Sequence, residues 1–138
     1  MVVVDVKFDI LTPLGAVREG IEVAGVEVPG IQGELGLLPH HESLVTAVTA
    51  GVIRFKEGNS SVRIAVGSGF LEVKEAGRVV ILVERAVESS DVDAAAAKSA
   101  RDEARKELDA YKGSVDAPEY RALHDRWAWN DAQVRAAS

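Results

Sequence analysis

The chain has 138 residues, a formal net charge of −6 at pH 7 and no cysteine. The missing cysteines exclude a disulfide framework and thiolate metal sites, and the acidic balance argues against nucleic acid and anionic lipid as direct partners. At this length the chain suits one modest domain, or a small domain with an appendage.

The N-terminal segment does not resemble a targeting signal. Residues 1–7 alternate like a strand and lack the basic region and the small-residue cleavage site of a signal peptide. No apolar stretch approaches the roughly 20 residues that span a bilayer as a helix. We therefore expect a mature, soluble, intracellular chain.

The first 88 residues read as strands and turns, and they hold all but one of the 12 glycines. Residues 2–10 alternate between apolar and charged side chains, which predicts a half-buried strand. After a turn at 12–15, strands are predicted over 16–19, 21–28, 44–48, 51–56, 62–66, 70–74 and 78–84, with hairpin turns at 57–60 and 75–77. This pattern predicts an antiparallel β-sandwich, or flattened barrel, of about ten strands.

The remaining residues are rich in alanine and charge and read as two helices. Asp91 or Asp93 can cap the first helix, whose apolar face collects Ala97, Ala100, Ala104, Leu108 and Tyr111. Residues 112–114 stop it, and the run from Asp116 to Glu119 resembles a capping box with a proline in the first turn of the second helix. That helix collects Tyr120, Leu123, Trp127, Asn130 and Val134 on its apolar face.

A short connection predicts that the two helices run antiparallel as a hairpin. Their shared apolar area is small, so the hairpin needs the sandwich or a partner to hold it and is expected to be a mobile appendage. Trp129 projects about 180° from the face that seals the hairpin. We therefore expect Trp129 to pack on the sandwich or to meet another protein.

The sequence assembles no catalytic set. His40, His41 and Glu42 form the one cluster that could ligate a metal, but neighbours on an extended chain point in opposite directions, so a turn or contact surface is favoured and no metal is expected. Ser68 lies between two glycines without the wider pattern of a nucleophile elbow, which favours a tight crossing or bulge. No phosphate-binding loop is present, and no cofactor is expected.

One run carries a resemblance to a known family. Gly33-Glu34-Leu35-Gly36-Leu37-Leu38-Pro39, followed by His41, Leu44-Val45-Thr46-Ala47 and Gly51-Val52-Ile53-Arg54, resembles the epsilon subunit of bacterial F-type ATP synthases. Gly69-Phe70-Leu71-Glu72-Val73 and Val79-Val80-Ile81-Leu82-Val83 match the same family in order and spacing. The resemblance covers essentially the whole chain.

The resemblance implies a non-catalytic subunit of the rotating central stalk, peripheral at the cytoplasmic face of the bacterial plasma membrane. The family's sandwich binds the gamma subunit and rests on the c-subunit ring, coupling proton-driven rotation to ATP synthesis. The resemblance assigns the contact with the c-subunit ring and gamma to Glu34, Leu35, Gly36 and His41. On this basis we divide the chain into a sandwich domain, residues 1–87, and a helix-turn-helix regulatory domain, residues 88–138.

In the family the hairpin either lies folded on the sandwich or extends along gamma to the alpha and beta catalytic subunits, where it inhibits ATP hydrolysis. The candidate contacts here are Arg121, Arg126, Trp129 and Arg135. The three arginines alternate with Asp125 and Asp131, so a solvated face is the simpler interpretation of these charges.

Three departures from the family pattern stand out. His40 replaces the usual glycine, and Gly67-Ser68-Gly69 replaces the usual serine-glycine-glycine. In the ATP-binding motif of some members, Asp93 is retained but Ala96 replaces the arginine, so no strong ATP site is expected.

Two alternatives remain open from the residues alone. One is an intracellular non-enzymatic adaptor with a peptide-binding β-sandwich and a coiled-coil hairpin, which would not purify with gamma. The other is a metal hydrolase that uses His40, His41 and Glu42, which would carry tightly bound metal.

Overall fold

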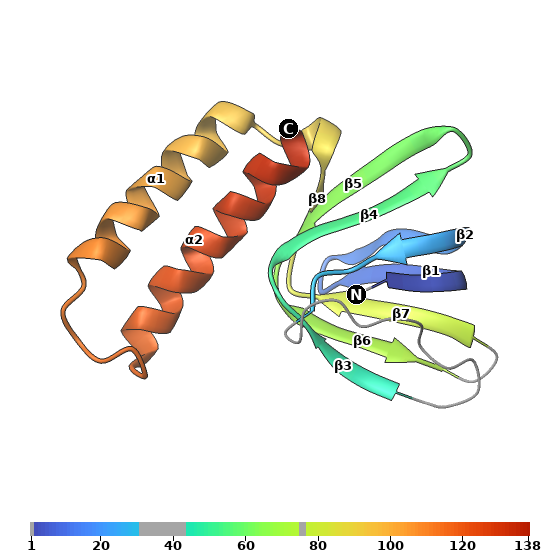
Figure 1. Cartoon of the computed structure of the whole chain (residues 1–138), viewed down its shortest axis with the longest axis horizontal. Helices are drawn as coiled ribbons and strands as arrows, with labels where there is room; N and C mark the ends of the chain where they lie inside the picture. The colour runs from blue at the N-terminus through green and yellow to red at the C-terminus, as the bar shows by residue number, and fades with distance from the viewer. Residues whose placement is uncertain (1, 31–43, 75–76) are drawn as a thin grey trace.

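The computed structural model describes residues 2–30, 44–74 and 77–138, and it shows a β-sandwich with a helical hairpin beside it (Figure 1). The strands are β1 (Val2–Thr12), β2 (Gly15–Glu27), β3 (Leu44–Val48), β4 (Gly51–Glu57), β5 (Ser60–Val66), β6 (Gly69–Val73), β7 (Arg78–Val83) and β8 (Ala86–Glu88). A short 3-10 turn, η2 (Ser89–Asp91), leads to helices α1 (Ala94–Ala110) and α2 (Pro118–Ala137). The predicted sandwich followed by a two-helix hairpin is confirmed.

The strands pair in the order β3-β6-β7-β1-β2-β4-β5-β8. In Figure 1, β4 and β5 lie in one layer, β3, β6 and β7 lie in the other, and β1 and β2 join the two. Each observed pairing is antiparallel except that of β1 with β7, which is parallel. The core between the layers is built from the alternate strand residues that point inward. Its fully buried members include Phe8, Ile53, Ile64, Leu71 and Ile81.

The described residues hold eight strands rather than about ten, and part of the difference lies in β2. The two strands predicted on either side of Gly20 form one continuous strand. Gly20 has a φ of +63° and lies where the β1–β2 register shifts, so the glycine marks a bulge instead of a turn. Asp9 accepts a hydrogen bond of 2.7 Å from the Gly20 N–H, which holds the bulge in place.

The two helices begin differently from one another. The Asp93 carboxylate caps α1 by accepting from the Ala96 N–H at 3.0 Å, as predicted for this position. The capping box predicted for α2 is wrong, because Ala117 is its N-cap and makes no side-chain bond. Pro118 occupies the first turn, where a missing N–H costs little.

The hairpin is closed by alanines and aromatic rings. Ala97 and Ala104 of α1 are buried, and the rings of Tyr111 and Tyr120 lie 5.4 Å apart. In Figure 1, α2 lies between α1 and the sandwich. The opposite side of α2 packs on the outward face of β4 and β5 through a cluster of Val52, Ala65, Ala132, Ala136 and Trp129.

Candidate functional site

An exposed apolar row crosses the outward face of β3, β6, β7 and β1. Phe70 pairs with Ala47 on one side and with Leu82 on the other, and Leu82 pairs with Leu11. Side chains that are direct neighbours across strands lie on one face of the sheet. We call these four residues the apolar row.

Its large side chains are poorly covered. Phe70 is 58% exposed, Leu82 44%, and Val45, two residues before Ala47 on the same face of β3, 64%. Neighbouring exposed apolar side chains are typical of surfaces that meet another protein. Such an arrangement can bind a partner but supplies no group for chemistry.

The fold holds the row rigidly because the alternate residues are core. Leu71, Val73, Ile81 and Val83 are buried on the inward face. Gly69 lets β6 approach β7 closely, since a Cβ placed there would lie 1.8 Å from the carbonyl oxygen of Leu82. The row therefore lies on strands whose inward side chains are packed in the core.

The residues predicted to contact the c-subunit ring and gamma, Glu34, Leu35, Gly36 and His41, lie outside the described residues. So do the other members of the histidine cluster, His40 and Glu42. Within the described ranges, no group of three or more His, Asp or Glu side chains is placed to hold a metal ion.

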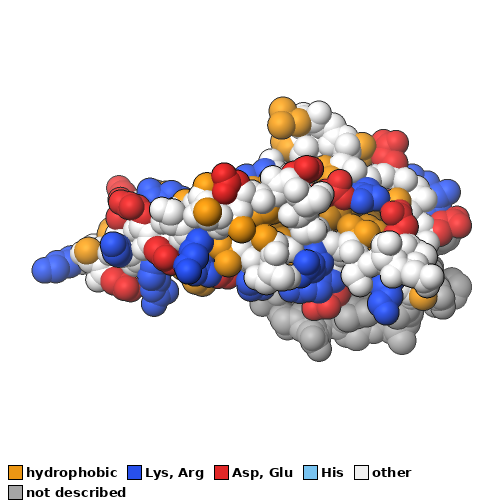
Figure 2. Space-filling view, turned by 90° about the horizontal axis from the view of Figure 1, so that it is seen from above, with side chains coloured by type: hydrophobic (Ala, Val, Ile, Leu, Met, Phe, Trp, Pro, Cys, Tyr) orange, Lys and Arg blue, Asp and Glu red, His pale blue; other side chains and the backbone are white. Residues whose placement is uncertain are grey.

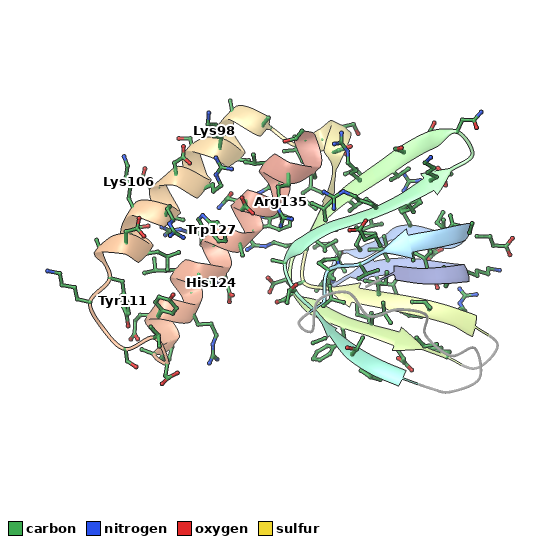
Figure 3. All side chains as sticks on the ribbon, in the orientation of Figure 1. Lys98, Lys106, Tyr111, His124, Trp127 and Arg135 are labelled. Atoms are coloured by element: carbon green, nitrogen blue, oxygen red, sulfur yellow. The ribbon has the colours of Figure 1, made fainter. Side chains whose placement is uncertain are left out.

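The four hairpin residues predicted to contact the catalytic subunits lie in different environments in the structure. Arg121 is exposed, and Arg126 pairs with Glu107 across the hairpin. Arg135 pairs with Asp131 at 3.0 Å on the same helix (Figure 3), while Trp129 packs against the sandwich. Figure 2 shows both signs of charge mixed over the projecting hairpin, in agreement with a solvated face.

Asp9 is the one buried charged residue among those described. Its carboxylate accepts the Gly20 N–H and, from the other side, the Arg78 guanidinium at 2.7 Å. The Gly20 hydrogen bond and the Arg78 charge together hold the pKa of Asp9 below its ordinary value. Asp9 is therefore an ionised, fully bonded structural group that ties β1 to β2 and β7.

Arg18 makes a second tie between strands. It donates to Glu57 on β4 at 3.2 Å and to Glu88 on β8 at 3.0 Å. The hydrogen bond and charge of Glu88, followed by Glu57, raise the pKa of Arg18. Like Asp9, Arg18 is engaged in ion pairs between strands and stabilises the sandwich.

The apolar row was not predicted from the sequence, although one signal for it is present. Residues 79–83 are apolar throughout, without the polar alternation of a strand that has one wet face. Such a run indicates that both faces of the strand are covered, and the outward face in this structure has Leu82 still exposed.

Within the described residues, neither helix has the length and hydropathy needed to cross a membrane.

Comparison with known proteins gives consistent matches. The family model described as ATP synthase, Delta/Epsilon chain, beta-sandwich domain, matches residues 5–89. The ATP synthase epsilon chain of Magnetococcus marinus is 37% identical over 134 residues, which cover 96% of this chain and 94% of that one. The ATP synthase epsilon chain of Halalkalibacterium halodurans is 43% identical over 100 residues, covering 72% and 74%.

Two solved structures share the fold. A chain in the Euglena gracilis mitochondrial ATP synthase, OSCP/F1/c-ring, has a TM-score of 0.73 at 22% identity and covers 96% of this chain and 81% of its own length. A chain in the Tetrahymena thermophila mitochondrial ATP synthase, central stalk/c-ring, has a TM-score of 0.57 at 14% identity, covering 97% of both chains.

Proposed function

The chain belongs to the ATP synthase Delta/Epsilon chain family, and from this premise we propose that it is the epsilon subunit of a proton-translocating F-type ATP synthase. It acts as a non-catalytic rotor subunit of the central stalk and couples rotation of the c-subunit ring to ATP synthesis. It is peripheral at the cytoplasmic face of the bacterial plasma membrane. The adaptor and metal hydrolase alternatives have no comparable support.

The apolar row is the observation that carries the partner assignment. A stalk subunit must transmit torque, so it needs a rigid, apolar surface on which gamma can bind. Phe70 and Leu82 provide this surface on strands whose opposite faces are fully packed core. Glu34, Leu35, Gly36 and His41 are the proposed contact with the ring.

The experiment is purification of the synthase from cells that express a tagged full-length chain. Wild type should bring down gamma, while Leu82→Asp should lose it because the partner surface would bury an unpaired charge. Asn59, exposed in the turn between β4 and β5 and outside both the apolar row and the hairpin, offers a control. Asn59→Asp should retain gamma, and equal recovery with both variants would remove the row from the interface.

We further propose that the hairpin regulates hydrolysis. When it leaves the sandwich and extends, Arg121, Arg126, Trp129 and Arg135 contact the alpha and beta subunits and inhibit ATP hydrolysis. The alanine-lined contact between α2 and the sandwich supports this, because it is small enough to open.

A charge reversal tests the regulatory role. Arg121→Glu in a reconstituted synthase should weaken inhibition, because an exposed cation on α2 meets the acidic segments of the catalytic subunits. Lys98, on the outward side of α1 (Figure 3), is the matched control. Lys98→Glu should leave hydrolysis at the wild-type rate. If Arg121→Glu also leaves hydrolysis at the wild-type rate, Arg121 makes no inhibitory contact.

We also propose that the hairpin lacks a strong ATP site. Ala96 offers no cation, and the Asp93 carboxylate already accepts the Ala96 N–H as a helix cap. The position of the hairpin in this subunit is then not gated by ATP.

A further inference from the structure

The buried apolar centre of the contact that docks the hairpin on the sandwich is small. It is built from Val52 and Ala65 on the outward face of β4 and β5, with Ala132 and Ala136 of α2 against them. The three alanines are fully buried. A methyl group removes less apolar area from water than a larger side chain does, so each alanine alone adds only modestly to the stability of the contact.

Trp129 is the one large side chain in the same cluster. The guanidinium carbon of Arg85 lies 4.5 Å from the centroid of its ring. Arg85 follows β7 and belongs to the sandwich, so this cation–π contact joins the two parts of the molecule. We call the pair the Arg85–Trp129 latch.

Gly67 provides the seat for Arg85. The Gly67 N–H donates to the Arg85 carbonyl at 2.9 Å. A Cβ at position 67 would lie 3.2 Å from Cγ of Arg85 and 2.7 Å from Cγ of Glu84. The first glycine of the Gly67-Ser68-Gly69 run thus leaves room for two side chains, those of Glu84 and of Arg85, which covers Trp129.

A second contact between the hairpin and β5 is weak. Arg63 donates a hydrogen bond to the carbonyl oxygen of Ser138 at the end of α2. This bond is exposed, and exposed polar contacts of this kind contribute little because water competes for both groups.

We propose that the Arg85–Trp129 latch, seated on Gly67, sets the fraction of molecules whose hairpin is docked, without any nucleotide. A cation over an indole ring stabilises a contact by about 0.5–2 kcal/mol, depending on its exposure. The latch therefore adds to the hold of the apolar contact and shifts the docking equilibrium severalfold. Its effect on hydrolysis rests on the proposed function, while the docking itself is a property of the isolated chain.

The absence of cysteine makes a direct test possible. A single Ala132→Cys in the full-length chain places a thiol in the buried contact, where it reacts with a maleimide only when the hairpin leaves. Under slow labelling, the rate is proportional to the undocked fraction. Ala104→Cys, buried in α1, serves as a second reporter that responds to loosening of the hairpin itself.

Arg85→Gln should raise the labelling rate of Ala132→Cys by about three- to tenfold, as expected for loss of one cation–π contact. The rate at Ala104→Cys should not change. Gly67→Ala should act in the same direction, because the added methyl would displace the side chain of Glu84, whose Cγ it would approach to 2.7 Å, and press on Cγ of Arg85 at 3.2 Å.

The matched control is Arg105→Gln. Arg105 lies over Trp127 at 5.8 Å, but both residues belong to the hairpin. This variant should leave labelling at Ala132→Cys unchanged. Labelling unaffected by both Arg85→Gln and Gly67→Ala would overturn the latch, and so would an equal rise at the two reporters.

Hydrolysis by the reconstituted synthase provides an independent readout. If the latch holds the hairpin away from the catalytic subunits, Arg85→Gln should deepen inhibition. Faster labelling without deeper inhibition would uphold the latch and count against the inhibitory part of the proposed function.

Discussion

Replacing Phe70 with alanine should weaken gamma binding by about 30-fold without harming the fold. An aromatic side chain offers about 200 Å² of surface, and 58% of that of Phe70 is exposed. At about 25 cal/mol per Å², complete burial of that exposed part stabilises the complex by about 3 kcal/mol. Because alanine keeps its Cβ and an interface covers a ring incompletely, we expect a loss of about 2 kcal/mol, which is about 30-fold in Kd.

Titration calorimetry of gamma against the full-length chain measures this loss. The melting temperature of Phe70→Ala should stay close to that of wild type, since the ring lies outside the core. Asn59→Ala, in the exposed turn between β4 and β5, should bind gamma with wild-type affinity. A Phe70→Ala affinity within threefold of wild type would refute the assignment of the row to gamma.

Three further predictions concern stability and ligand binding. Asp9→Asn should lower the free energy of unfolding by about 2 kcal/mol in urea titrations at pH 7. The pKa of Asp9 is lowered in the folded state. The greater stability of the wild type is therefore present above the unfolded-state pKa, about 4, and disappears as the pH falls through the folded-state pKa. Gly69→Ala should cost at least about 3 kcal/mol, since its Cβ meets the backbone of Leu82. Calorimetry with ATP should show no low-micromolar dissociation constant, because Ala96 supplies no cation; one in that range would contradict the proposal.

The sequence predicted the architecture well where local patterns decide it. Alternation in residues 2–10 and the alanine face of α1 each define which side is buried, and both predictions are confirmed at Phe8, Ile10, Ala97 and Ala104. The continuity of β2 through Gly20 was not predictable from local pattern, because it depends on a bulge held by Asp9 from another strand.

The candidate site was harder to predict than the fold. The apolar row is formed by residues from four strands, so it depends on which strands become neighbours. The parallel pairing of β1 with β7 brings Leu11 beside Leu82, and no sequence pattern predicts that pairing. The same holds for the latch, where Arg85 and Trp129 lie far apart in the chain.

Binding of gamma through the apolar row can be measured by single-cysteine footprinting. Leu82→Cys and Asn59→Cys chains would be labelled with a maleimide in the absence and presence of saturating gamma; Asn59 is exposed in the turn between β4 and β5. We expect gamma to slow labelling at position 82 by tenfold or more, as for a buried interface residue, and to leave labelling at position 59 unchanged. Equal labelling at position 82 with and without gamma would contradict binding through the apolar row.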